Sequence, residues 1–296
     1  MLKALLKTMR PRQWTKNVFV FAALVFDGKL FHLPDFLRTL AGFGLFCLIS
    51  SAVYIFNDLL DVEADRQHPV KKNRPIPSGK LPVPAAIAAG VILSLLAVTL
   101  GLLLTWQYAL TVLFYLVMML AYSKWLKHIP ILDVLILAAG FVLRVHSGTT
   151  LIVVERFSPW LYVLMTLLAL YLGFGKRRAE LALLLADVSS DTPLSEGFRK
   201  VLDGYTIPLL DQFITIVSGT TIVAYSLYTF FRPDTPGNHE LMLTIPFVIY
   251  AIFRYLYLIQ VKQIGGEPEE ILLSDRPFQV SILLWGFAIL AVFYLT

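Results

Sequence analysis

Residues 36–66 read FLRTLAGFGLFCLISSAVYIFNDLLDVEADR, an apolar run that ends in a group of acids. The apolar part is long enough to cross a bilayer as a helix, which takes about 20 residues. If that helix continues past Asp58, then Asp58, Asp61 and Asp65 fall at i, i+3 and i+7 and share one face. Asn57 lies four residues before Asp61 and joins them. The stretch therefore predicts a membrane-spanning helix with carboxylates gathered at its end.

These carboxylates predict a metal site. Neighbouring carboxylates repel one another, at a cost of about 4 kcal/mol for each close pair at an effective dielectric of about 20. The group therefore requires raised pKa values or a bound cation. An all-oxygen ligand set favours Mg2+, which usually completes its shell with water and substrate phosphates. We expect Asp58, Asp61 and Asp65 to bind Mg2+ on a diphosphate, with Mn2+ able to substitute; the alternative is a solvated acidic helix end.

A basic loop follows the acids directly. Several prolines between residues 69 and 84 forbid a long regular helix there. Lys72 and Arg74 are suitably placed to neutralise phosphate oxygens that a metal leaves uncovered. Acids followed at once by bases are what a metal-diphosphate site requires, whereas a solvated helix end would leave the basic run unexplained.

The composition is that of a membrane protein. Apolar residues make up 57% of the 296 positions and charged residues 15%, and the mean hydropathy is +0.73. Near-spanning apolar stretches fall at 17–31, 36–56, 83–105, 107–123, 130–153, 158–175, 207–231, 241–261 and 278–296. Barrel strands would instead show short alternating segments. We expect an all-α, polytopic bundle of about nine transmembrane helices, forming a single domain over 1–296.

The basic residues predict the orientation of the bundle. Most of the 25 Lys and Arg residues fall in the N-terminal segment and in alternate loops, a bias typical of the cytosolic side. The basic residues predicted on the outer side of the membrane are Lys29, Arg38, Arg156 and Arg232. We therefore expect a multi-pass protein of the cytoplasmic membrane with the acidic site facing the cytosol. The net charge of +5 follows from this topology and requires no nucleic acid.

The N-terminal segment 1–16 reads as an interfacial amphipathic helix, and its end carries further candidate residues. Arg12, Lys16 and Asn17 surround a tryptophan at the membrane boundary, where they either contact phosphate or anchor the chain. Arg144 lies within a span, at a cost of roughly 2.5–3.5 kcal/mol, so it should face a partner or a polar cavity. Asp133 is too far along the helix to pair with it; a structural pairing and a substrate role both remain open.

A second basic group lies at the end of the sixth span, in the sequence GFGKRRAEL at 173–181. Lys176 and Glu180 are spaced for an i,i+4 pair, and the glycines at 173 and 175 permit close approach of a helix or ligand. We expect active-site loops over 57–82 and 176–206. In the second of these, Asp187 and Asp191 form either another metal site or a polar linker. The single cysteine, Cys47, excludes a disulfide framework.

The motifs resemble those of a known family. NDLLDVEAD at 57–65 followed by RPIPSG at 74–79 looks like the UbiA superfamily of intramembrane prenyltransferases. Further stretches are similar to its decaprenyl-phosphate phosphoribosyltransferase branch: RPRQWTKN at 10–17, DVEADRQHP at 61–69, GKRRAEL at 175–181, YT at 205–206 and GEPE at 266–269. The resemblance covers nearly the whole chain.

The resemblance implies Mg2+-dependent transfer of a 5-phosphoribosyl group from phosphoribosyl diphosphate to a polyprenyl phosphate in the membrane lipid, for cell-envelope arabinan synthesis. The catalytic residues would be Asp58, Asp61, Lys176 and Arg177. Together with the residues proposed from their position and charge, the candidate substrate-binding residues are Arg12, Lys16, Asn17, Asn57, Lys72, Arg74, Tyr122, Lys124, Arg144, Glu180 and Tyr205. The alternative is prenyl transfer from a polyprenyl diphosphate to an aromatic or other small acceptor. It is weakened because basic residues occupy the place of the superfamily's second acidic motif. A transporter would instead distribute charges through the membrane midplane.

Overall fold

The structure is a computed structural model that describes residues 1–68, 70–155, 158–188, 200–231, 239–262, 271 and 274–294. Every regular element among these residues is a helix, which confirms the all-α prediction. The chain divides into two compact units, Met1–Glu155 and Arg156–Thr296. The expectation of one domain over 1–296 stays a prediction.

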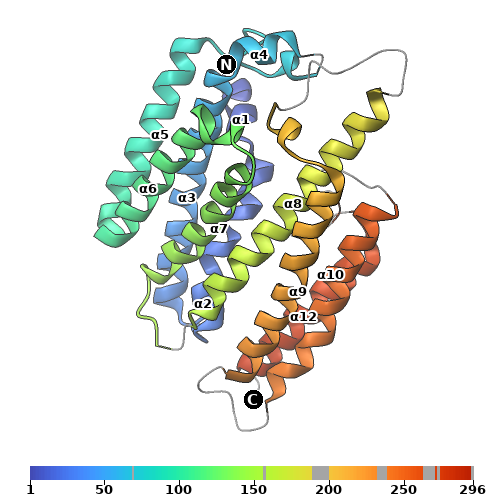
Figure 1. Cartoon of the computed structure of the whole chain (residues 1–296). Coiled ribbons are helices and arrows are strands. Elements are labelled where there is room, and N and C mark those ends of the chain that lie inside the picture. Colours follow the sequence, from blue (N-terminus) through green and yellow to red (C-terminus); the bar gives the residue numbers. More distant parts are fainter. Residues whose placement is uncertain are drawn as a thin grey trace. The chain divides into compact units, whose positions relative to one another are not determined.

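The first unit begins with short helices and continues with four long ones (Figure 1). Its α-helices are α1 (Leu2–Met9), α2 (Ala22–Phe26), α3 (Leu33–Leu60), α4 (Val62–Gln67), α5 (Val83–Leu104), α6 (Trp106–Lys124) and α7 (Leu132–Thr149). Its 3-10 helices are η1 (Pro11–Phe21), η2 (Lys71–Asn73) and η3 (Leu126–His128).

Helix α3 is the central element of this unit and contacts α1, η1, α5 and α6. A small residue permits one close approach: a Cβ at Gly90 of α5 would lie 2.9 Å from Cζ of Phe56 in α3. A buried hydrogen bond fixes another, because Tyr108 Oη of α6 donates to the carbonyl of Gly42 at 2.6 Å. Glycine and buried polar groups thus bring these apolar helices together, as is usual inside a membrane.

The long helices of the first unit alternate in direction, as their colours along the chain show in Figure 1. The segment after α3 and the connection after α6 therefore lie at the same end as the N-terminus. At the other end, Thr105 Oγ1 donates to the carbonyl of Thr150 at 3.1 Å. This alternation brings acids and bases from distant parts of the sequence to one end.

The second unit contains α8 (Trp160–Val188), η5 (Lys200–Gly204), α9 (Ile207–Phe231), η6 (Glu240–Thr244), α10 (Ile245–Gln260) and α12 (Arg276–Tyr294). Helix α8 packs along α9, and α10 contacts both α9 and α12. Arg178 of α8 donates to Asp211 Oδ1 of α9 at 2.6 Å and to the carbonyl of Ile259 at 3.1 Å. Gly175 of α8 faces Tyr255 of α10, where a Cβ would lie 2.7 Å from the hydroxyl. The expected close approach at Gly175 is therefore present.

Among the described residues, seven helices have the length and apolarity to cross a membrane: α3, α5, α6, α7, α9, η6 with α10, and α12. Residues 160–175 of the predicted stretch 158–175 form the first part of α8, which continues into a charged segment. The predicted stretch 17–31 contains no helix of spanning length, because η1 is a 3-10 helix and α2 ends before Gly28, whose φ is +74°. A hydropathy profile shows that a stretch is apolar, but it does not show whether that stretch forms one continuous helix.

Helix α8 also corrects a predicted boundary. The expected loop over 176–206 begins instead as helix, which continues to Val188. The sequence AELALLLA at 179–186 consists of residues with high helix propensity, so the charges at 176–178 do not end the helix. Asp191 lies outside the described residues, and the side chain of Asp187 is not described.

Candidate active site

The acidic motif lies where α3 passes into α4. Helix α3 ends at Leu60, and Asp61 separates it from α4. The backbone stays nearly helical across this break, because the N–H of Asp61 donates to Asn57 at 3.0 Å and that of Asp65 donates to Asp61 at 2.8 Å. Asp58 and Asp65 are buried, at 2% and 4% exposure, while Asp61 is half-buried. The predicted continuation of the helix past Asp58 is therefore present, with a break at Asp61.

Each of these carboxylates bonds to a basic side chain. Asp58 Oδ1 accepts from Arg10 Nη2 at 2.5 Å and from Arg74 Nη1 at 3.2 Å. The same Arg74 nitrogen donates to Asp65 Oδ2 at 2.7 Å. Asp61 instead accepts from Lys127 Nζ at 2.5 Å and from the amide of Asn57 at 3.2 Å. Asp58 and Asp65 therefore converge on one cation, while Asp61 turns to another.

Arg10 is a member of this cluster that sequence reasoning placed outside the candidate site. It is the C-cap of α1 and adopts a left-handed backbone with φ 53°. Such a conformation costs about 1–3 kcal/mol for a non-glycine residue and persists where surrounding contacts enforce it. Here the contacts are the bond to Asp58 and the ring of Tyr54, 5.0 Å from the guanidinium. Pro11, which disfavours α-helical geometry at residue 10, is the sequence signal.

Lys127 is the second residue that sequence reasoning missed. It lies on η3, directly after α6, and is largely buried at 16% side-chain exposure. Its neighbour Lys124, a predicted substrate-binding residue, is exposed and lies 4.5 Å from the ring of Trp125. Tyr122 is 7% exposed. Charge pattern alone could place both lysines at the cytosolic rim, but could not tell which one reaches the acids.

The loop that carries Arg74 is anchored by its apolar residues. Ile76 and Leu81 are each 1% exposed and pack with Met9 of α1 and Ile55 of α3. Gly79 has φ +76°, a value that glycine adopts without a steric penalty. Lys72, in contrast, is exposed, and so is Arg12 on η1. Arg74 is held against the carboxylates by its two hydrogen bonds.

Asn17 and Arg144 lie together inside the first unit. Arg144 Nε donates to Asn17 Oδ1 at 2.9 Å, and its other nitrogens donate to the carbonyl of Gly140 at 2.7 Å and to Tyr115 Oη at 2.9 Å. The amide of Asn17 donates to Ser50 Oγ at 3.1 Å. These bonds join η1, α3, α6 and α7, so they supply the partner that an intramembrane arginine requires. Substrate contacts of these two residues, and of half-buried Lys16, stay predictions.

In the second unit, Arg177 is 1% exposed and donates to Glu180 Oε2 at 2.7 Å. Arg177, at i,i+3 spacing, bonds to that carboxylate, and the expected pairing of Lys176 with Glu180 stays a prediction. Tyr205 is buried at 4% exposure, just after η5. The catalytic roles of Lys176 and Arg177, and the substrate-binding roles of Glu180 and Tyr205, stay predictions.

Comparison with known proteins identifies the same family as the acidic motif. The model of the UbiA prenyltransferase family matches residues 17–177, which include the acids and their basic loop. This chain belongs to the UbiA prenyltransferase family. The resemblance inferred from the motifs is thereby confirmed.

Two relatives of this UbiA chain match it over nearly its whole length. The decaprenyl-phosphate phosphoribosyltransferase of Corynebacterium glutamicum is 33% identical, with 98% of this chain and 87% of that protein covered. The decaprenyl-phosphate phosphoribosyltransferase of Mycobacterium tuberculosis is 35% identical, with 96% and 92% covered. A solved UbiA homolog from Archaeoglobus fulgidus, bound to DMAPP and Mg2+, has a TM-score of 0.70 at 17% identity, with 99% of each chain covered. At this level of identity, the similarity to the Archaeoglobus fulgidus homolog shows that the two proteins share a fold.

The donor set of this UbiA protein fits a hard divalent cation in its chemistry. Asp58 and Asp65 are buried carboxylates that share one cationic nitrogen, and no described hydrogen bond reaches Oδ2 of Asp58 or Oδ1 of Asp65. Oxygen ligands of this kind are what Mg2+ prefers. Among the described residues, however, no three acidic, histidine or cysteine side chains are gathered as a metal site, because Asp61 faces Lys127. Two of the predicted ligands thus converge, and the third is bound to a base.

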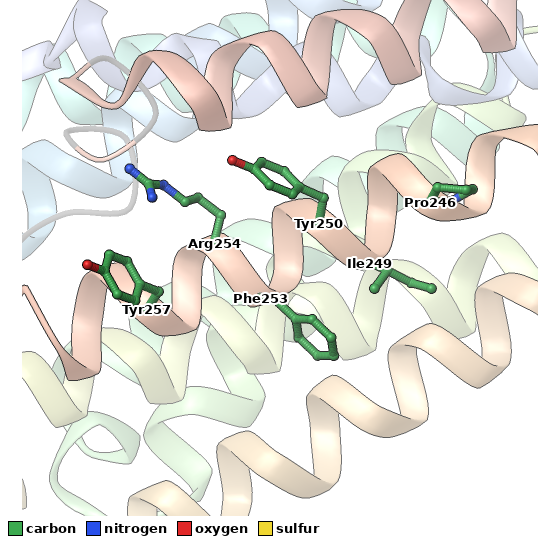
Figure 2. Close-up of a pocket in the computed structure, with 6 residues that line it drawn as sticks. All are labelled: Pro246, Ile249, Tyr250, Phe253, Arg254 and Tyr257. Atoms are coloured by element: carbon green, nitrogen blue, oxygen red, sulfur yellow. The ribbon is translucent and has the colours of Figure 1, made fainter.

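The second unit has a groove along α10, shown in Figure 2. It has a volume of about 510 Å³ and is lined by Pro246, Ile249, Tyr250, Phe253, Arg254 and Tyr257. In Figure 2, Arg254, Tyr250 and Tyr257 extend on one side of the helix and Phe253 and Ile249 on the other. Arg254 makes two hydrogen bonds to Asp275, at 2.8 and 3.1 Å. The charge at this groove is therefore neutralised within the unit.

Proposed function

We propose that this UbiA protein transfers a 5-phosphoribosyl group from phosphoribosyl diphosphate to a polyprenyl phosphate and releases diphosphate. The observation that carries the proposal is the similarity to decaprenyl-phosphate phosphoribosyltransferases over 96–98% of the chain. Similarity of this extent includes both the acidic motif and the basic residues around it. The reaction therefore belongs to the glycosyltransferases, with a pentosyl group as the transferred unit.

The residues of the first unit are suited to this reaction. Two anionic substrates must approach each other, and positive charge near the acids lowers the electrostatic cost of that approach. Arg10, Arg74 and Lys127 provide this charge. The lipid phosphate is already ionised near neutral pH, since the second pKa of a phosphate monoester is about 6. No general base is then required, and the work of the protein is to bind, orient and neutralise.

We assign Asp58 and Asp65, with Asp61 as the third carboxylate, to hold Mg2+ on the donor diphosphate. When bound there, the metal supplies Lewis-acid stabilisation of the departing diphosphate. Asn57 restrains the Asp61 side chain through its amide. Arg74 and Lys127 stabilise phosphate oxygens as negative charge builds up on the leaving group. The Mg2+ in the Archaeoglobus fulgidus homolog supports the use of a divalent metal.

The proposed location is the bacterial cytoplasmic membrane, with the site on the cytosolic face. Support comes from the seven apolar helices of spanning length and from the basic segments at the acidic end of the first unit. Phosphoribosyl diphosphate is a highly charged, water-soluble donor, so a site facing the cytosol gives it access. The lipid product would supply arabinan synthesis for the cell envelope.

A double-label assay tests the proposal. Purified protein receives Mg2+, polyprenyl phosphate, and either ribose-labelled phosphoribosyl diphosphate or a prenyl-labelled diphosphate with an aromatic acceptor. We expect ribose label to enter the lipid fraction and the prenyl label to remain unreacted. Transfer of prenyl label alone would overturn the proposal in favour of a prenyltransferase, the activity for which the bound DMAPP of the Archaeoglobus fulgidus homolog is the supporting observation.

A further inference from the structure

Arg74 holds an unusual position between two buried acids. A single nitrogen, Nη1, donates to Asp58 Oδ1 at 3.2 Å and to Asp65 Oδ2 at 2.7 Å. The two carboxylates come from α3 and α4, whereas Arg74 comes from the loop that Ile76 and Leu81 anchor. One guanidinium nitrogen therefore links α3 and α4 by donating a hydrogen bond to a carboxylate of each helix.

This atom lies where a divalent cation bound by both acids would lie. Mg2+ binds carboxylate oxygens at about 2.0–2.1 Å, so the two oxygens need to close by only about an ångström around the same centre. A guanidinium nitrogen and a metal ion cannot occupy that place together, and their charges repel. Binding of an ion to Asp58 Oδ1 and Asp65 Oδ2, the two oxygens that Arg74 contacts, therefore requires Arg74 to leave.

The Arg74 side chain is accessible enough to move away from the acids, and it can bind phosphate after it has moved. Its side chain is 31% exposed, whereas the side chains of its two partners are only 2% and 5% exposed. The acids are thus the more enclosed partners, and the base is the partner with access to solvent. Asp58 keeps a second base after the exchange, since Arg10 Nη2 lies 2.5 Å from its Oδ1. The released guanidinium is suited to bind phosphate oxygens in a bidentate manner.

We propose that Arg74 is a resident counter-cation: a divalent metal displaces it from between Asp58 and Asp65, and the displaced guanidinium then binds the phosphates that arrive with the metal. This inference rests on the proposed function for the metal and the diphosphate. It makes Arg74 a competitor of the metal in the absence of diphosphate and a partner of the metal in its presence. If Arg74 merely stabilised the fold, its effect on metal affinity would not change from unfavourable to favourable when diphosphate is added.

The test measures binding of Mn2+, by calorimetry or by the electron paramagnetic resonance of free Mn2+, on the full-length protein in detergent. We expect Arg74→Gln to bind Mn2+ about tenfold more tightly than the wild type, the size of effect that loss of a charge-assisted hydrogen bond gives. In the presence of inorganic diphosphate the order should reverse, with weaker binding of the Mn2+-diphosphate complex by the variant.

Two control variants separate the exchange from a general loss of charge. Arg66→Gln removes the same charge from an exposed residue of α4 that pairs with Glu63 and touches neither acid, so it should leave Mn2+ affinity near that of the wild type. Arg74→Lys keeps the charge, so its Mn2+ affinity without diphosphate should stay near that of the wild type, whereas its binding of the Mn2+-diphosphate complex should weaken because lysine lacks the bidentate fork. Thermal unfolding gives a second measurement: Arg74→Gln should melt lower without metal, and Mn2+ should raise its melting temperature more than that of the wild type.

Unchanged or weaker Mn2+ binding by Arg74→Gln without diphosphate would overturn the inference, as would an equal gain in Arg66→Gln. Failure of the proposed function is distinguished by the ribose-label assay. If the wild type transfers ribose label and Arg74→Gln shows no gain in Mn2+ affinity, the exchange alone is wrong. If no ribose label enters lipid, the proposed function is wrong whatever the metal affinities are.

Discussion

Lys127 Nζ lies 2.5 Å from Asp61 Oδ1, although 66 positions separate the two residues in the sequence. The contact joins the connection after α6 to the junction between α3 and α4. Both side chains are partly buried, at 16% and 30% exposure, so solvent screens the pair less than it would a surface ion pair. Lys127 thereby becomes part of the candidate site, next to the acids that sequence reasoning had already selected.

Replacing Lys127 with glutamine should reduce kcat/KM for phosphoribosyl transfer by about ten- to a hundredfold, because a hydrogen bond to a charged group contributes about 1.5–3 kcal/mol. The measurement is the initial rate of ribose-label transfer. Lys80→Gln serves as the matched control, since Lys80 is an exposed lysine in the loop after the acids. Equal activities of the two variants would contradict a role for Lys127.

Replacing Asp58 with asparagine should abolish transfer while the protein still inserts and folds. The substitution keeps the side-chain volume but removes the charge that faces Arg10 and Arg74, and with it a predicted metal ligand. We expect a loss of at least about a hundredfold in kcat, as is usual when an electrostatic catalytic contact is lost. Detergent-solubilised yield and melting temperature provide the folding control. Near-normal turnover of this variant, or of Asp61→Asn, would remove the metal assignment.

Removing divalent metal should stop the reaction. Purified protein treated with an excess of EDTA is expected to lose ribose-label transfer, and Mg2+ or Mn2+ added back in excess of the chelator should restore it. The physical reason is that the diphosphate leaving group needs its charge stabilised in the transition state. Full activity in the chelator, with phosphoribosyl diphosphate intact, would show that the carboxylates serve another purpose.

Replacing Gly175 with alanine should destabilise the second unit. The new Cβ would lie 2.7 Å from Tyr255 Oη and 2.9 Å from its Cε1, and overpacking of this kind costs about 1–3 kcal/mol. The melting temperature of the purified protein is the measurement. Gly219→Ala on α9 is the control, because nothing lies within 4 Å of its Cβ position and alanine favours the helix. A lower melting temperature for Gly219→Ala than for Gly175→Ala would contradict the close packing.

The ion pair at α10 predicts a pH dependence of stability. The hydrogen bond from Arg254 holds the pKa of the Asp275 carboxyl below its ordinary value of 3.8. A lowered folded-state pKa stabilises the protein above the unfolded-state value, and this contribution is lost as the pH falls through the folded-state pKa. The difference in melting temperature between the wild type and Asp275→Asn should therefore be full at pH 6 and shrink as the pH falls from about 4 through the lower folded-state pKa of Asp275. A constant difference over this range would show that Asp275 acts only through its hydrogen bonds.

Several features of this protein could be inferred before its structure was known. The apolar runs gave the helical membrane fold, and the acids at 57–65 with the bases at 71–74 gave the candidate site and the family. These inferences succeed because they depend on local chemistry: apolarity over a bilayer length, and residue types at helical spacing. They fail at 17–31, where packing against α3 and α7 holds a 3-10 helix, and at 176–188, where strong helix formers extend α8.

The sequence by itself determined which groups are present: a helical chain that can span a membrane, with carboxylates suited to a divalent cation and a surplus of bases near them. Only the tertiary structure decided the pairing, in which Arg10 and Arg74 meet Asp58, Arg74 also meets Asp65, and Lys127 meets Asp61. The physical reason is the separation along the sequence between the paired residues. Helical spacing fixes neighbours within a few residues, whereas contacts across tens of positions depend on the directions in which α3, α5, α6 and α7 pack.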